Sequence, residues 1–260
     1  MMASSEVVVY ANGELLAAAA AARLVTRLVD LQAAKGSASL VLTGGGTGIA
    51  VLEQLRRSPA RDAVDWSRLD LYWGDERFVP ADDDERNEKQ AREALLDHVP
   101  VDPKRVHAMA ASDGEFGDDV DAAAAAYAQV LADNARPEDH GDVPQFDICL
   151  LGLGGEGHTA SVFPESPAVY ETERSVVAVR NCPKPPPTRV SLTLPAIRRS
   201  HDVWLMTTGE AKADAVALAL SGAGEVQVPV AGARGQRRTL WLLDRTAASK
   251  LSNVYQPPTA

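Results

Sequence analysis

The residues best suited to chemistry lie in the segment LGLGGEGHTASVFP (151–164), where Glu156 and His158 stand among four glycines directly behind an apolar run. Histidine titrates near neutral pH and can take a proton from water, and a nearby carboxylate can orient the ring and stabilise the imidazolium. Glycines leave the backbone open to a ligand, so Gly155 and Gly157 are candidate binding residues. This segment predicts a general base, His158, with Glu156 as its partner.

The rest of the chain offers no competing metal or thiol chemistry. The remaining histidines lack a comparable setting, and they are His98, His107, His140 and His201. No HxH, HExxH or CxxC pattern is present, which argues against a metal site. The two cysteines are far apart in the sequence, and Cys149 lies in an apolar run, which favours a reducing compartment.

A second candidate site is LVLTGGGTG (40–48), an apolar run that leads into glycines and then a helical pattern. Glycines at such a junction let the backbone approach a ligand, and the start of the helix offers free N–H groups to an anion. Gly45, Gly46 and Thr47 are therefore candidate phosphate-binding residues. The motif is neither GxGxxG nor a Walker A sequence, so a plain tight turn is the alternative interpretation.

Charged residues stand at three further strand boundaries. Asp75 and Arg77 follow an apolar run in LYWGDERFVP (71–80), and Arg189 begins RVSLTLP. Lys212 lies in the first predicted turn of a helix, where a cation opposes the helix dipole unless an anion binds nearby. Solvated turns and a tolerated lysine are the alternative interpretations of these residues.

The elements that must position these residues alternate along the chain. Predicted strands occupy 6–11, 39–45, 69–75, 146–154, 175–180, 189–194, 202–209 and 239–244. Predicted helices occupy 13–36, 47–58, 85–99, 118–135 and 210–222. This alternation predicts an α/β fold, with a doubly wound, Rossmann-like, mostly parallel sheet and helices on both faces, in one main domain over 1–260. Because the candidate residues fall at strand ends, we expect one crevice that holds an anion and a base.

The composition excludes several classes of partner. The chain has 260 residues, and 26 basic against 36 acidic side chains give a net charge of −10, which repels nucleic acid and acidic membranes. No run of about 18 apolar residues and no basic leader segment is present, so we expect a soluble cytoplasmic protein. Nothing marks an apolar interface, and we expect a monomer.

Five sequence blocks resemble those of a known family, the 6-phosphogluconolactonases, which are related by fold to the glucosamine-6-phosphate deaminase/isomerases. The blocks are LTGGGT, WGDERFVP with the downstream ERNEKQARE, GLGGEGHTASVFPES, RVSLTLPAI and TGEAKADAV, in order from about residue 40 to 220. The resemblance implies cofactor-independent hydrolysis of 6-phospho-D-glucono-1,5-lactone to 6-phospho-D-gluconate, the second step of the oxidative pentose phosphate pathway.

The resemblance also implies roles for single residues. His158 falls on the family's general base, and Glu156 stands where many relatives carry aspartate. Asp75 falls on a strand-end aspartate that the deaminases use in proton transfer and that the lactonases also carry. Substrate and phosphate oxygens are implied to be held by Gly45, Gly46, Thr47, Arg77, Arg189 and Lys212.

Three alternatives are weighed against the lactonase. Deaminase/isomerases usually follow the loop histidine with a FNEP-like stretch, whereas this chain has TASVFPES. A non-enzymatic sugar-phosphate sensor would normally carry a DNA-binding segment, and no helix-turn-helix pattern precedes EVVVYANGE. A dinucleotide-dependent oxidoreductase would need the GxGxxG fingerprint and its acidic residue, which are missing.

Overall fold

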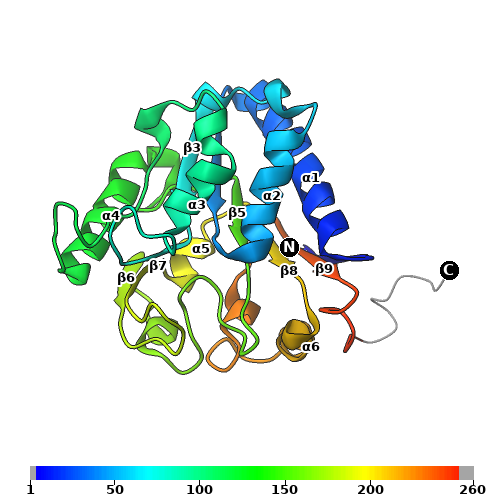
Figure 1. Cartoon of the computed structure of the whole chain (residues 1–260). Coiled ribbons are helices and arrows are strands. Elements are labelled where there is room, and N and C mark those ends of the chain that lie inside the picture. Colours follow the sequence, from blue (N-terminus) through cyan, green and yellow to red (C-terminus); the bar gives the residue numbers. More distant parts are fainter. Residues whose placement is uncertain (1–3, 252–260) are drawn as a thin grey trace.

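The computed structural model describes residues 4–251 and is built around a six-stranded sheet (Figure 1). The strand order is β1-β9-β8-β5-β2-β3, and every neighbouring pair is parallel. The strands are β1 (Ser4–Tyr10), β2 (Ala38–Leu42), β3 (Leu69–Trp73), β5 (Ile148–Leu151), β8 (Asp202–Thr207) and β9 (Arg238–Asp244). The predicted doubly wound parallel sheet is confirmed.

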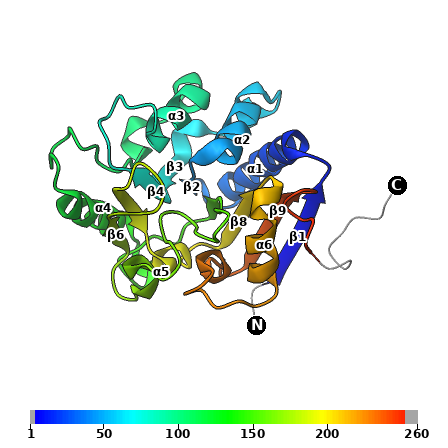
Figure 2. The same ribbon diagram turned by 60° about the horizontal axis from the view of Figure 1, so that its bottom comes forward.

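Helices cover the sheet on both sides (Figure 2). On one face lie α1 (Gly13–Lys35), α2 (Gly45–Arg57) and α3 (Asn87–Ala94), and on the other lie α4 (Val120–Asn134) and α5 (Leu194–Ile197). Since both faces are covered, β5 and β8 are buried at every position and read as continuous apolar runs. No helix within residues 4–251 is long and apolar enough to cross a membrane.

The longest helix, α1, has clear sequence signals at both ends. The side chain of Asn12 accepts the N–H of Leu15 at 2.9 Å, and Gly36 ends the helix with a φ of 84°. The apolar stripe that faces the core recurs every four residues, at Leu16, Ala20, Leu24 and Leu28. Helix boundaries elsewhere differ slightly from the predictions: α3 ends at Ala94, before a 3₁₀ turn at Leu96–His98.

Lys212 was predicted in the first turn of a helix, but in the structure it lies just before the helix begins. It closes a 3₁₀ turn, Glu210–Lys212, and immediately precedes α6 (Ala213–Leu220). Conversely, Gly45 and Gly46, which were expected in a loop, form the first turn of α2.

A second, antiparallel sheet departs from the single sheet expected from the sequence. It contains β4 (Asp75–Arg77), β7 (Arg189–Leu192) and β6 (Val176–Val179), so the predicted strands at 175–180 and 189–194 lie outside the main sheet. The predicted strand at 69–75 divides at Gly74. The Gly74 N–H donates to the Leu42 carbonyl in β2 at 2.9 Å, whereas the Gly74 carbonyl accepts from the N–H of Leu192, the last residue of β7, at 2.9 Å. The chain therefore passes from one sheet to the other at this residue.

The order in which the chain adds strands reverses at β2, which has β3 on one side and β5 on the other. In such folds, ligands bind beyond the carboxyl ends of the strands where the order reverses. The glycine segment at 43–48 follows β2, and the segment at 152–158 follows β5. The topology thus brings the two predicted glycine loops to one place.

Candidate active site

A cavity of about 130 Å³ lies where these loops meet. It is lined by Thr43, Gly44, Gly45, Asp75, Arg77, Asn87, Gly152, Leu153, His158, Ala160 and Arg189. Five candidates from the sequence are thus brought together, namely Gly45, Asp75, Arg77, His158 and Arg189. The candidates at 46, 47, 155, 156, 157 and 212 are not among the lining residues.

His158 is held in one orientation by Glu156 and Phe163. Its Nδ1 lies 2.8 Å from Oε1 of Glu156, and its ring stacks on Phe163 with 4.4 Å between ring centroids. Burial lowers the pKa of His158 below its ordinary value of 6.5, and the charge of Glu156 opposes this shift only partly. At neutral pH the ring is therefore uncharged. Its Nδ1–H donates to the carboxylate, which leaves Nε2 as a proton acceptor.

The loop that carries His158 depends on three glycines. A Cβ atom at Gly154 would lie 2.1 Å from His158 Nδ1, so no other residue leaves room for the ring. Gly157 has a φ of 89°, and its N–H donates to the Gly154 carbonyl at 2.9 Å. A Cβ atom at Gly155 would lie 2.8 Å from the Ala211 carbonyl oxygen. Gly155 and Gly157 therefore shape the loop rather than line the cavity.

Glu156 is a permanent anion between two basic groups. Burial opposes its ionisation, but its own backbone N–H, His158 and Lys184 lower the pKa of the carboxyl group to about 2. The Lys184 ammonium donates to Oε2 at 3.1 Å, while Oε1 accepts from the imidazole. The ring is thus aligned by a carboxylate that is itself fixed from the other side.

Asp75 lines the cavity and is almost fully buried. Its Oδ2 accepts from the Ser161 hydroxyl at 2.6 Å and lies 3.9 Å from Nη1 of Arg189. The amide of Asn87 donates to the backbone carbonyl of Asp75 at 2.9 Å. These contacts fix the carboxylate in position.

Arg189 connects the cavity to the proline-rich loop at 181–188. Its Nε donates to the Pro186 carbonyl at 2.6 Å, and its Nη2 donates to the Lys184 carbonyl at 3.1 Å. The same loop sends the Lys184 side chain to Glu156. Arg189 thereby holds in place the loop that supports the histidine pair.

The start of α2 forms the second wall of the site. Gly44 caps the helix without a side-chain hydrogen bond, and no acidic residue occupies its first turn. The hydroxyls of Thr47 and Thr208 lie 3.2 Å apart, which joins this turn to the loop that leads to Lys212. Burial, and then repulsion from Lys184, lower the pKa of Lys212. The first turn of α2 has no acidic side chain, and burial and Lys184 destabilise the charged form of Lys212. Both features favour the binding of an anion at this wall of the site.

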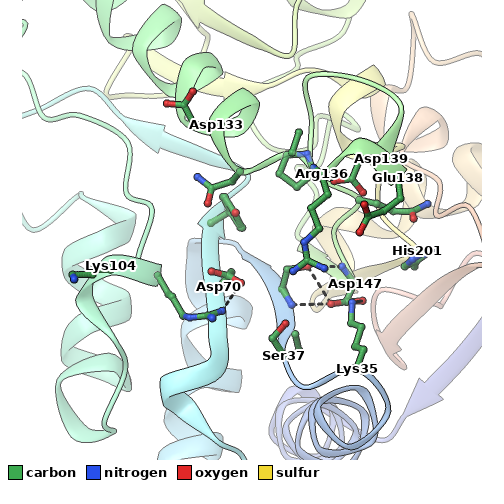
Figure 3. Close-up of a pocket in the computed structure, with 18 residues that line it drawn as sticks. Lys35, Ser37, Asp70, Lys104, Asp133, Arg136, Glu138, Asp139, Asp147 and His201 are labelled. Carbon is green, nitrogen blue, oxygen red and sulfur yellow. Dashed lines mark hydrogen bonds and ion pairs between the residues drawn. The ribbon is translucent and has the colours of Figure 1, made fainter.

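A larger cavity, of about 560 Å³, lies at the opposite ends of the strands (Figure 3). It is lined by residues at the amino ends of β2, β3, β5 and β8, including Asp70, Asp147 and His201. Two of its acids are already paired, with the buried Asp147 2.6 Å from Lys35 and the partly exposed Asp70 2.8 Å from Arg105. The glycine loops do not reach it, so we place the chemistry in the smaller cavity.

Several residues of the site were not singled out in the sequence. They are Gly44, Asn87, Gly154, Ser161 and Lys184. Asn87 lies within the ERNEKQARE block and Gly154 within the glycine loop, so a residue-by-residue treatment of those blocks could have found them. Within residues 4–251, no group of three or more His, Cys, Asp or Glu side chains is placed to hold a metal ion.

Comparison with known proteins agrees with this arrangement. The family model described as glucosamine-6-phosphate isomerases/6-phosphogluconolactonase matches residues 11–241. The chain belongs to this family. The chain is 63% identical over 260 residues to the 6-phosphogluconolactonase of Streptomyces coelicolor, covering 100% of both chains. It is 57% identical to that of Mycobacterium tuberculosis, covering 95% of this chain and 99% of the relative.

A solved family member has the same fold. The 6-phosphogluconolactonase structure from Trypanosoma brucei superposes with a TM-score of 0.82 at 29% identity, covering 96% of this chain and 99% of that one. The family resemblance of the five sequence blocks is thereby confirmed, both by sequence and by fold.

Proposed function

We propose that the chain hydrolyses 6-phospho-D-glucono-1,5-lactone to 6-phospho-D-gluconate, with His158 as general base. The observation that carries this proposal is the neutral imidazole in the cavity, whose Nδ1 lies 2.8 Å from Glu156 and whose Nε2 is left to accept a proton. The names of the relatives supply the substrate.

The reaction follows from this pair. His158 Nε2 takes a proton from water as the water oxygen attacks C1 of the lactone. The imidazolium that forms is stabilised by Glu156. Collapse of the tetrahedral intermediate breaks the bond between C1 and the ring oxygen, which takes the proton from the imidazolium and becomes the C5 hydroxyl. The new carboxylic acid then ionises.

Electrostatic stabilisation comes from the backbone and the basic side chains. Backbone N–H groups of the two glycine loops stabilise the oxyanion that develops on the C1 carbonyl. We assign the phosphate to the start of α2, with Gly45, Gly46, Thr47 and Lys212, because no acidic side chain occupies that turn. Arg77 and Arg189 are assigned to substrate oxygens on the opposite wall.

Direct attack by water is favoured over an acyl-enzyme. None of the residues that line the cavity is serine or cysteine, and the nearby Ser161 hydroxyl donates to Asp75. A lactone is an activated ester, so an oriented base and a preorganised oxyanion site suffice.

We further propose that the enzyme works without a cofactor, as a cytoplasmic monomer. Both cysteines are free, which suits a reducing compartment. The exposed large apolar side chains within residues 4–251 are Leu15, Tyr170 and Leu218, on three separate elements. A contiguous apolar patch of the kind that marks a subunit interface is therefore not formed by these residues.

The test is an assay with the lactone made in situ from glucose 6-phosphate. The rate of acid release, or of a coupled dehydrogenase, is compared with spontaneous hydrolysis. The proposal requires acceleration by the wild-type protein. A rate equal to the background, together with release of ammonia from glucosamine 6-phosphate, would assign the chain to the deaminase reaction instead.

A further inference from the structure

Asn87 is a buried polar residue of the cavity to which the mechanism above assigns no role. This residue begins α3, is 2% exposed and lines the 130 Å³ cavity. Its Nδ2 donates to the Asp75 carbonyl at 2.9 Å and lies 3.5 Å from Asp75 Oδ1. Its Oδ1 has no hydrogen-bond donor among the described residues.

The orientation of this amide is determined by its surroundings. If the group were flipped, Oδ1 would face the carbonyl oxygen of Asp75, and two acceptors would repel each other. The nitrogen therefore faces Asp75, and the oxygen is the atom without a partner.

The backbone of Asn87 is equally constrained. Both carboxylate oxygens of Glu76 accept from the start of α3, from the Asn87 N–H at 2.7 Å and from the Glu88 N–H at 2.8 Å. Asn87 thus cannot easily move to find another donor.

The glycine loop leaves space for the free oxygen. A Cβ atom at Gly44 would lie 1.9 Å from Asn87 Oδ1. Gly44 has a φ of −80°, which any residue can adopt, so backbone strain does not require glycine there. The requirement for glycine at this position comes from the asparagine oxygen.

We infer that Asn87 Oδ1 accepts a hydrogen bond from a ring hydroxyl of the bound substrate and so selects a polyhydroxylated lactone. A buried acceptor without a donor is costly, and the cost is removed when a ligand supplies the O–H. The proposed substrate carries hydroxyls at C2, C3 and C4 of its ring, and each can donate. This inference rests on the proposed lactone hydrolysis.

The test compares Asn87→Ala with wild type on four substrates, the parent lactone and its 2-deoxy, 3-deoxy and 4-deoxy analogues, each made by oxidising the matching sugar phosphate. For wild type, one deoxy analogue should lose on the order of 10-fold in kcat/KM through the missing contact with Asn87. The variant should lose a similar factor on the parent lactone. On that one analogue the variant should lose nothing further, because the hydrogen bond is already absent.

Two further variants separate substrate recognition from structural damage. Gly44→Ala keeps Asn87 but displaces its oxygen. Like Asn87→Ala, it should cause no further loss of kcat/KM on the deoxy analogue that lacks the contacting hydroxyl. This variant therefore tests the contact even if Asn87→Ala does not fold. Glu93→Ala, at an exposed position of α3, should match wild type on all four lactones.

The outcomes are distinguishable from failure of the proposed function. If wild type does not accelerate hydrolysis of the parent lactone, the lactonase assignment itself is lost. Suppose instead that wild type is active, but Asn87→Ala and Gly44→Ala lower kcat/KM by the same factor on all three deoxy analogues as on the parent lactone. Asn87 then has a structural role, and the inference is overturned.

Discussion

At the level of single residues, the account depends on the pair His158 and Glu156, whose pKa values are both below their ordinary values. Burial keeps the imidazole uncharged at neutral pH, and the contacts of Glu156 keep its carboxyl group ionised, with a pKa of about 2. A neutral base beside a fixed anion is ready to accept a proton and to stabilise the resulting charge. Lys184 holds the far oxygen of the same carboxylate at 3.1 Å.

Glu156→Gln tests this pair. The amide keeps an acceptor for Nδ1–H but removes the charge that raises the pKa of His158 and stabilises the imidazolium. We expect kcat to fall by about 10²-fold, because the imidazolium loses its counter-charge, and the acid limb of the kcat/KM profile to move to lower pH. The measurement is the pH dependence of kcat/KM, with Glu115→Gln, an exposed carboxyl group, as control. An acid limb at unchanged or higher pH would remove Glu156 from this role.

The chemistry of the site was accessible from the sequence where a residue follows a strand, as for His158 and Asp75. Such residues share an edge of the sheet, so their proximity follows from the fold class. Asn87 and Lys184 were not found, because each contacts a residue in a distant segment of the chain. The hydrophobic periodicity of a sequence does not show which distant segments come into contact. Asn87 reaches Asp75 from the next helix, and Lys184 reaches Glu156 across 28 positions of the chain.

At the level of elements, the junction of β3, β4 and α3 positions one wall of the site. Glu76, which directly follows Asp75, is fully buried and accepts the N–H groups of Arg77, Asn87 and Glu88 at 2.7–2.8 Å. One carboxylate therefore ties the short strand β4 to the start of α3. In the sequence Glu76 belongs to the charged run at 75–77, for which a solvated turn was the alternative interpretation. In the structure it lies in β4, against the start of α3, and is buried.

Burial has a consequence for stability at different pH values. It raises the pKa of Glu76 from 4.5 to about 7, although Arg86 and the three N–H groups oppose the shift. Between these values the folded state binds more protons at this group than the unfolded state. The stability that the protonated group contributes is therefore fully present below about pH 4.5 and is lost as the pH rises through about 7.

Glu76→Gln tests this linkage. The variant should be less stable than wild type, because an amide N–H₂ group replaces one acceptor oxygen. The difference in unfolding free energy between wild type and variant should decrease as the pH rises from about 4.5 to about 7. Urea denaturation of both proteins across this range provides the measurement. A difference that grows with pH would contradict the raised pKa.

The elements were largely predictable, but their partners were not. Strand and helix periodicities located the main helices and every strand other than β4, with Gly36 and Asn12 marking the ends of α1. The segments at 175–180 and 189–194 are buried on both faces, so their apolar pattern matches that of the parallel strands. In the structure β7 pairs in antiparallel fashion with β4 on one side and with β6 on the other. The pairing with β4 depends on the redirection of the chain at Gly74, which the pattern does not encode.

At the level of the whole molecule, an acidic chain gathers basic groups at one crevice. The net charge is −10, yet Arg77, Lys184, Arg189 and Lys212 lie around the ends of adjacent strands of the parallel sheet. A local concentration of positive charge, which attracts anions, is thus combined with a net negative charge of the whole chain. The alternation of strands and helices predicted this single crevice because parallel strands end at the same edge.

Lys212→Ala tests the assignment of the phosphate. Wild type should prefer the 6-phosphorylated lactone over unphosphorylated glucono-1,5-lactone. The variant should lose much of this preference, mainly through a higher KM for the phosphorylated substrate, by a factor on the order of 10 or more. Its activity on the unphosphorylated lactone should be nearly unchanged. An equal loss on both substrates would show that Lys212 does not contact the phosphate.

The central claim is that His158 is the base that activates water, and the rate of His158→Ala on the 6-phosphorylated lactone tests it most directly. With spontaneous hydrolysis subtracted, kcat should fall on the order of 10²–10⁴-fold, while the variant folds as wild type does by circular dichroism. The wild-type acid limb should lie below pH 6.5, since burial lowers the pKa of this histidine, and it should be absent from the residual activity. A folded variant with near-wild-type kcat would contradict the account.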